Sequence, residues 1–141
     1  MIYRTPTILL FLIVVIWIPR IQGDPFIFEV DIQCAKTIPH WCGELIIYEE
    51  DDRNHDVLRK HQFCTKDTSV QFVSELINPG GDFGFEYEFK YKLKHTCSSD
   101  GQERCIQLEK RLDMPKGLAR TISWNITAFA SGRLQCYDDG L

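Results

Sequence analysis

Residues 83–95 read FGFEYEFKYKLKH, and this stretch decides the fold class. Aromatic residues and then Leu93 occupy every second position, whereas charged residues fill the positions between them from Glu86 onward. Successive side chains of a strand point to opposite faces, so a period of two separates the two sets, whereas the 3.6-residue period of a helix would scatter them. The stretch therefore predicts a long β-strand with an apolar face and a charged face. Gly84 marks a point where this strand is expected to bend or break.

Shorter segments of similar character lie on both sides of this strand. Apolar and polar residues alternate, or apolar residues cluster, in residues 26–34, 42–49, 70–73, 106–112 and 121–128. Residues 57–64 fit either a strand or a short helix. Glycine, proline and other turn-forming residues separate the segments, and no long amphipathic helix is evident. This pattern predicts an all-β fold, an antiparallel two-sheet β-sandwich.

The first 23 residues have the three-part organisation of a secretory signal peptide. Arg4 provides a positive charge, residues 8–18 are wholly apolar, and Gly23 offers a small residue at a cleavage point. As a helix the apolar run would reach about 16 Å, roughly half of a ~30 Å hydrocarbon core. An uncleaved membrane anchor is therefore the less favoured alternative. We expect a signal peptide over residues 1–23, one domain over residues 24–141 that acts outside the cell, and no transmembrane segment after cleavage.

Removal of this leader would make the chain more acidic. The sequence has 16 basic and 20 acidic residues, and the leader holds Arg4 and Arg20 but no acid. Cleavage thus leaves 14 basic residues against 20 acidic ones, a net charge of −6. Such a chain lacks the electrostatic attraction on which nucleic-acid binding depends, so nucleic acid is not an expected partner.

All six cysteines follow the leader, at Cys34, Cys42, Cys64, Cys97, Cys105 and Cys136. An even number of cysteines in a short exported chain predicts three disulfides. The alternative, a zinc site, needs Cys-x-x-Cys or similarly close Cys/His pairs, which this spacing does not provide. A local bridge across a short loop favours the pair Cys97–Cys105. By the same spacing Cys34 would pair with Cys42, and Cys64 with Cys136 would complete that scheme.

Asn125, Ile126 and Thr127 form an N-glycosylation sequon. The alternation of this segment places Asn125 on the face opposite Trp124 and Ile126, toward water. We expect a glycan at Asn125, and the alternative is an ordinary polar position on a sheet. A glycan there would prevent that face from packing tightly against another sheet.

An acidic loop provides the best candidate for a metal site. Asp52, Asn54 and Asp56 supply oxygen atoms at alternate positions, as Ca²⁺ prefers. An EF-hand would also need glycine at Val57 and glutamate at Phe63, and neither is present. The alternative is a solvated acidic loop, so no metal ion or other cofactor is expected.

Two further groups of residues lie on the long strand. His95 is on its apolar face near Cys97, which favours a buried, hydrogen-bonded histidine over a ligand or catalytic base. Lys90, Lys92 and Lys94 form a basic stripe on the opposite face. This stripe could meet phosphate headgroups or an acidic partner, or it could be a solvated face balanced by nearby glutamates. It would discourage edge-to-edge aggregation if the strand were an edge strand.

Several features follow one another in a distinctive order. Behind the leader come a strand ending in Cys34, an apolar strand that runs into an acidic stretch, Thr65 and Asp67 ahead of Phe72, a strand that ends in His95-Thr96-Cys97, and then Cys105. This order resembles the secreted transthyretin-like family of nematodes. The resemblance covers nearly all of residues 26–130. The sequence departs from the family in having no glycine just before Phe72 and in adding Cys42, Cys64 and Cys136.

The resemblance implies a prealbumin-like β-sandwich from a family that largely lacks assigned activities. Some members resemble extracellular adaptors that recognise exposed phosphatidylserine, whereas the thyroid-hormone site of transthyretin matches no residues here. No catalytic arrangement of residues is evident in the sequence. We therefore expect a secreted, non-enzymatic binding or adaptor module for an extracellular protein or a phospholipid headgroup. A small apolar-ligand carrier is the alternative, ahead of a secreted hydrolase or enzyme inhibitor; the sequence leaves the oligomeric state open.

Overall fold

The computed structural model describes residues 24–51, 55–79, 84–117 and 119–137, which contain strands and no helix. The strands are β1 (Phe26–Gln33), β2 (Trp41–Glu49), β3 (Asp56–Thr65), β4 (Ser69–Val73), β5 (Glu86–His95), β6 (Arg104–Gln107), β7 (Leu112–Pro115) and β8 (Arg120–Thr127). The predicted signal peptide, residues 1–23, lies outside the described residues. In the part of the chain that is described, no helix has the length and apolar character needed to span a bilayer.

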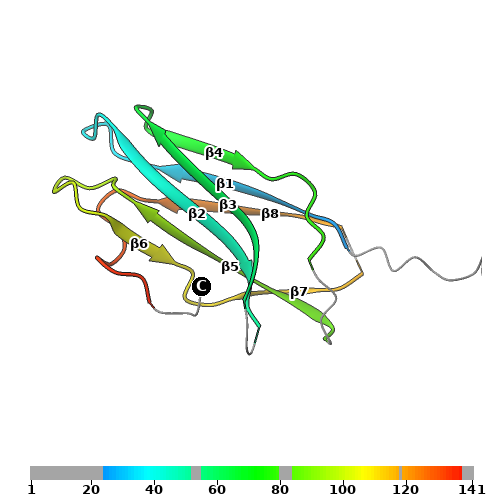
Figure 1. Ribbon diagram of the computed structural model, residues 1–141. Coiled ribbons are helices and arrows are strands. Elements are labelled where there is room, and N and C mark those ends of the chain that lie inside the picture. Colours follow the sequence, from blue (N-terminus) through cyan, green and yellow to red (C-terminus); the bar gives the residue numbers. More distant parts are fainter. Residues whose placement is uncertain (1–23, 52–54, 80–83, 118, 138–141) are drawn as a thin grey trace, which may run out of the picture.

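The strands form two sheets packed face to face (Figure 1). One sheet has the strand order β4-β1-β8, and the other has the order β3-β2-β5-β6, with β7 also pairing with β5. All pairs are antiparallel except β1 and β8, which run parallel along their whole length. The predicted two-sheet β-sandwich is therefore confirmed, with one parallel pair that joins the first and last strands.

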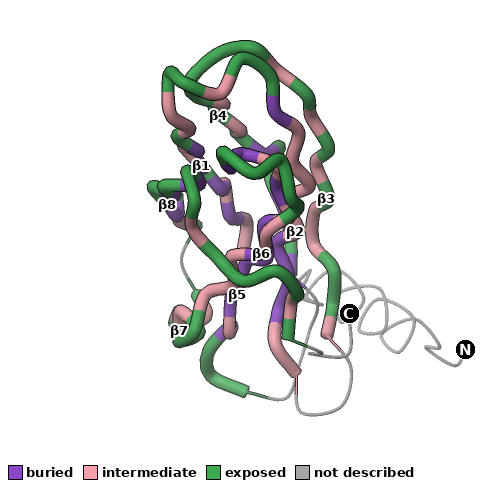
Figure 2. The backbone as a smooth tube through the Cα atoms, turned by 90° about the vertical axis from the view of Figure 1, so that its left-hand side faces the viewer, coloured by how far each residue is buried: buried purple, intermediate pink, exposed green. Residues whose placement is uncertain are grey.

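Aromatic rings fill the space between the two sheets. Phe28 of β1 meets Phe89 of β5 edge-on at 5.2 Å between ring centroids, and it stacks on Trp124 of β8 at 5.5 Å. Figure 2 shows buried residues along β1, β2 and β5, whereas β3 and β4 carry half-buried and exposed ones. The period-two apolar faces of the central strands thus form the core, and edge-to-face ring contacts add specificity to their packing.

The stretch that predicts the long strand forms β5 only from Glu86 onward. The strand begins after Gly84, where a bend or break is expected, and the apolar face does not extend to Phe85, whose side chain is 93% exposed. The first ladder partner of β5 at this end is Pro115 of β7, opposite Glu86. Phe85 precedes the ladder, and although its carbonyl accepts a hydrogen bond from the Lys116 N–H at 2.9 Å, its side chain is exposed to solvent. Phe83 lies outside the described residues.

In two other segments the periodicity of the sequence is ambiguous or gives the wrong strand. The ambiguous residues 57–64 form part of β3, not a helix. The single strand predicted over 106–112 is wrong, because the chain instead makes the two short strands β6 and β7. Both pair with β5, but β6 pairs with the half near His95 and β7 with the half near Glu86. The chain therefore leaves the sheet between them.

All six cysteines form disulfides, as predicted, but the predicted pairing is wrong. The bonds join Cys34 to Cys97, Cys42 to Cys64, and Cys105 to Cys136. Cys97 follows β5 with the parity of the inward residues, and it is fully buried. Cys105 pairs across the sheet with Lys94, whose side chain is on the outer face. A bridge across the short loop is excluded because the two side chains start from opposite faces of one sheet.

The other two predicted bridges fail because of where the sheets place their cysteines. Cys34 continues the inward parity of β1 and packs against the core, whereas Cys42 is on the outer face of β2, directly opposite Cys64 of β3. Cys34 consequently bonds across the core to Cys97 of the other sheet, and Cys42 bonds to its neighbour. Cys64 is on the β3 edge, far from the opposite edge where Cys136 follows the chain past β6.

The residues after β8 fold back along the free side of β6. The backbone N–H of Cys105 donates to the carbonyl of Arg133 at 2.7 Å, and the Arg133 N–H donates back at 2.9 Å. Farther on, the N–H of Tyr137 donates to the Gln107 side chain at 2.7 Å. Together with the disulfide Cys105–Cys136, these bonds attach the segment to the five-stranded sheet.

Candidate binding surface

The outer face of the five-stranded sheet contains an open groove of about 540 Å³. We call it the outer groove. Its lining comes from neighbouring strands and the loop after β5: Cys42, Gly43, Glu44, Gln62, Phe63, Cys64, Lys94, His95, Thr96 and Glu103. The register explains the grouping, because Glu44 of β2 is directly opposite Gln62 of β3 on one side and Lys94 of β5 on the other. Cross-strand neighbours point to the same face, so their side chains meet in the groove.

Glu44 is at the centre of the charge distribution in this groove. Its carboxylate accepts a hydrogen bond from the Gln62 amide and forms an ion pair with Lys60 at 3.1 Å. The Gln62 hydrogen bond, with the charges of Lys60 and Lys94, holds the pKa of Glu44 below its usual value against the opposing effect of burial. Glu44 is therefore anionic at neutral pH, with the ammonium of Lys94 on the neighbouring strand.

A disulfide and two hydrogen bonds hold together the strands that form the floor of the outer groove. The disulfide Cys42–Cys64 ties β2 to β3. On the other side, the Cys42 N–H donates to Thr96 Oγ1 at 3.0 Å, and the Thr96 N–H donates to the Cys42 carbonyl at 3.0 Å. The groove thus presents charges of both signs, together with amide and hydroxyl groups, on strands that are fixed relative to one another. This arrangement can bind polar or zwitterionic groups without rearranging.

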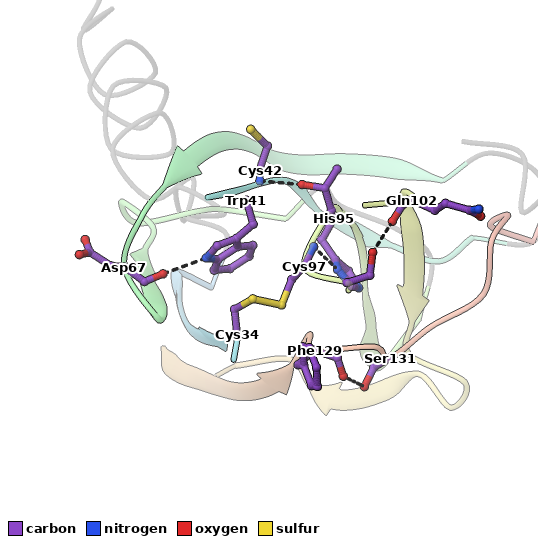
Figure 3. The surroundings of a disulfide bond; sticks show 11 residues. Cys34, Trp41, Cys42, Asp67, His95, Cys97, Gln102, Phe129 and Ser131 are labelled. Atoms are coloured by element: carbon purple, nitrogen blue, oxygen red, sulfur yellow. Dashed lines mark hydrogen bonds between the residues drawn. A yellow bond between two sulfur atoms is a disulfide. The ribbon is translucent and has the colours of Figure 1, made fainter. Parts of the chain in front are cut away.

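His95 is buried where β5 meets this floor, with 1% of its surface exposed. Its Nδ1 accepts a hydrogen bond from the Cys97 N–H at 3.2 Å, beside the disulfide Cys34–Cys97 (Figure 3). Burial lowers the pKa of His95, and the charge of Arg104 acts in the same direction against a partial compensation from the Ser131 backbone. As predicted from its position, His95 is a buried, hydrogen-bonded histidine, and it is neutral with its proton on Nε2.

The three lysines of the predicted basic stripe have different environments. Lys90 forms an ion pair with Glu50 at 2.5 Å, Lys92 is buried, and only Lys94 lines the outer groove. The stripe also lies on a central strand, since β5 pairs with β2 on one side and with β6 and β7 on the other. A role in protecting a sheet edge is therefore excluded for these lysines.

The calcium candidate is mostly outside the described residues, which lack Asp52 and Asn54. Asp56 is exposed at the start of β3. Elsewhere, a ring nitrogen of His40 lies within 4.8 Å of the sulfur atoms of Cys42 and Cys64. Those sulfur atoms are bonded to each other and cannot act as thiolate ligands, so this cluster is not a metal site.

Asn125 is exposed on the outer face of the three-stranded sheet, as its alternation predicts. Trp124 and Ile126 pack against or lie within the core on the other face. In the ladder, Asp31 of β1 lies between Asn125 of β8 and Gln71 of β4. A shallow hollow of about 290 Å³ follows this row of residues. The site is accessible to a modifying enzyme in the folded chain.

The outer groove was not predicted from the sequence as a site, because its residues come from three strands whose neighbours are not evident from the chain alone. The outward parity of Glu44 and Lys94 could have suggested a shared face. Only the strand order β3-β2-β5 makes them adjacent.

The sequence of this chain matches a known protein family over most of its length. Residues 29–139 match a family described as Caenorhabditis elegans protein of unknown function (DUF870). The chain belongs to the DUF870 family. No curated protein matches it. No solved structure matches it.

The part shared with the DUF870 family includes the candidate binding surface and the sequon described above. It begins within β1 and ends after Cys136, so it contains all three disulfides, the outer groove and the sequon at Asn125. The family description assigns no activity, and the case for a function rests on the chemistry of these features.

Proposed function

We propose that this DUF870-family protein is a secreted, non-enzymatic binding module that engages an extracellular protein or a phospholipid headgroup through the outer groove. The observation that carries the proposal is the pairing of Glu44 and Lys94 in an open, braced groove. A partner that presents both a cation and an anion within a few ångströms, such as a phosphoserine headgroup, complements this pair.

Secretion is supported by the leader-like residues 1–23 together with the disulfides. Three structural disulfides persist in oxidising compartments and are rare in the cytosol. The sequon at Asn125 is exposed, and we include a glycan at this site in the proposal. The resemblance to nematode transthyretin-like adaptors remains part of the same proposal and adds phosphatidylserine as a specific ligand to test.

A small apolar-ligand carrier has less support. Such a carrier would need an apolar cavity between the sheets, and rings from Phe26, Phe28, Phe89 and Trp124 pack against their neighbours in that space. The outer groove is instead open, and its lining combines charged and polar side chains with Phe63 and the disulfide Cys42–Cys64. It is better suited to a surface-bound polar partner.

The test is co-sedimentation of the secreted protein with vesicles of phosphatidylcholine alone and with added phosphatidylserine or phosphatidylglycerol. We expect binding only with phosphatidylserine, because phosphatidylglycerol has no ammonium for Glu44 and the quaternary ammonium of phosphatidylcholine has no N–H to donate to a carboxylate. Lys94→Gln should reduce the bound fraction at least several-fold, whereas Lys110→Gln, at an exposed lysine outside the groove, should not change it.

The effect of Ca²⁺ on vesicle binding distinguishes the outer groove from the acidic loop as the binding site. Binding that is independent of Ca²⁺ agrees with the groove, whereas binding that requires Ca²⁺ would move the site to the region of Asp56. Equal binding to both anionic lipids would show simple charge attraction and contradict the zwitterion model. No binding to any vesicle would remove the headgroup form of the proposal and leave a protein as the partner class.

A further inference from the structure

Most sheet edges in the described chain carry a feature that hinders pairing with another molecule. β3 has Arg59 and Lys60 along its length and a register shift against β2, and β4 is only five residues long. The free side of β6 is occupied by the backbone of Arg133, and β7 has four residues and ends in Pro115. Charges, bulges, short length, proline and a covering segment are the usual means by which proteins protect sheet edges.

β8 is the exception among these edges. It pairs with β1 through eight consecutive residues without a register shift, and from Thr121 to Thr127 it has no charged residue and no proline. Among the described residues, no strand pairs with its other side. Isoleucine, threonine and tryptophan also give the segment a high β-propensity.

The hydrogen bonds at the two ends of β8 define which backbone groups face outward. The Arg120 N–H donates to the Pro25 carbonyl at 3.2 Å, and the Ala128 N–H donates to the Gln33 carbonyl at 2.8 Å. Backbone groups alternate in direction along a strand, so even-numbered residues bond to β1. The N–H and C=O groups of the odd-numbered residues therefore point to the open edge: Thr121, Ser123, Asn125 and Thr127.

Asn125 belongs to this outward set and lies between Ser123 and Thr127 within it. It is exposed, and it is the acceptor residue of the sequon. We propose that an N-linked glycan on Asn125 protects the β8 edge and prevents this edge from pairing with β8 of a second copy of the chain. A paired strand would run about 4.8 Å away, within the space that a bulky glycan on the central residue of the edge would occupy.

This role goes beyond the proposed binding function, because it concerns the sheet opposite the outer groove. It also explains how a long, neutral and otherwise unprotected edge can remain on a protein in solution. The chain would then use a covalent modification at the one edge that lacks the charges and coverings of the others.

The test compares variants made in eukaryotic secretory cells. Thr127→Ala removes the sequon but keeps Asn125, whereas the matched control Thr127→Ser retains the sequon. We expect the wild type and Thr127→Ser to lose mass on treatment with an N-glycosidase and to be monomeric by light scattering. Thr127→Ala should lack the glycan and shift to a dimer or larger species.

Two measurements make the result specific to the edge. Enzymatic removal of the glycan from the folded wild type should cause the same association without any substitution. Adding Thr121→Lys to Thr127→Ala should restore the monomer, because a charge on the outward set opposes close pairing.

A relocated glycan separates edge protection from general solubility. Gln71→Asn with Val73→Thr, made in the Thr127→Ala background, creates a sequon on β4 in the same cross-strand row as Asn125. This variant should still associate, since the β8 edge stays open. Absence of a glycan from the wild type, a monomeric deglycosylated protein, failure of the lysine to restore the monomer, or a monomer restored by the relocated glycan would each overturn the proposal.

Discussion

His95 is a titratable side chain in a site that disfavours its charge. Its ring is enclosed at the end of β5, accepts a hydrogen bond from the Cys97 backbone and lies near the cationic Arg104. Protonation would convert Nδ1 from an acceptor into a donor facing another donor. The local structure around the inter-sheet disulfide therefore depends on a neutral imidazole.

Acidification should consequently destabilise the fold through His95. Its folded-state pKa is below the ordinary value of 6.5, so the unfolded chain binds the proton more readily. This contribution is fully present above pH 6.5 and declines as the pH falls below that value toward the folded-state pKa. Urea unfolding above and below pH 6.5 should show a larger stability loss for the wild type than for His95→Gln, which keeps an acceptor for the Cys97 N–H but does not titrate. Equal losses in the two proteins would show that other groups control this pH dependence.

Among the structural elements, the long strands follow from the sequence because each has one face on the core and the other on the outside of its sheet. β1, β5 and β8 largely follow the period-two pattern, since their side chains alternate between core and outer face. β2 loses the alternation at its register shift, after which Tyr48 and Glu49 are both buried. The prediction fails where pairing ends, as at Phe85, or where two short strands share one partner, as for β6 and β7. Partner strands are set by long-range contacts, and periodicity contains no information about them.

The segment after β8 depends on one glycine for its path along β6. Gly132 has a φ of 87°, and a Cβ there would lie 2.4 Å from the carbonyl oxygen of Cys105. Only glycine combines this conformation with such a close backbone approach. The position of Arg133 against β6 is therefore tied to this residue.

Gly132→Ala should destabilise the protein by more than the conformational strain of a left-handed residue, which is about 1 kcal/mol. Gly101→Ala is the matched control, because Gly101 has a φ of 67° but open space where a Cβ would lie. The difference between the two variants in free energy of unfolding measures the close approach to Cys105. Similar losses in both variants would mean that the segment moves away from β6 at little cost.

At the scale of the whole molecule, the disulfides have distinct structural roles. Cys34–Cys97 joins the two sheets and closes a sequence separation of 63 residues, whereas Cys105–Cys136 closes 31 residues and attaches the C-terminal segment to β6. The sequence predicts that all cysteines pair but not how, because the face on which each cysteine lies becomes known only with the sheet. The outer groove could not be predicted from the sequence either, because it forms only when three strands lie side by side in a defined order.

Replacing each cysteine pair by alanine should show how much each disulfide contributes to stability. Removing a disulfide typically costs about 2–4 kcal/mol, and a doubled loop length adds roughly 0.6 kcal/mol to the constraint. Cys34→Ala with Cys97→Ala should therefore lower the thermal midpoint more than Cys105→Ala with Cys136→Ala. Loss of core packing at the buried Cys97 acts in the same direction. An equal or larger effect of the second pair would show that the C-terminal segment contributes more to the fold than the link between the sheets.

The parallel pairing of β1 with β8 has a consequence for the time course of synthesis. The first strand leaves the ribosome long before its eventual neighbour, since residues 34–119 separate them. The hairpin of β2 and β3, with its own disulfide, can close early, but Cys34 must wait for Cys97. During that interval Cys34 can react with the wrong thiol, so correct maturation of this chain calls for a disulfide isomerase in addition to the oxidant that forms the three bonds.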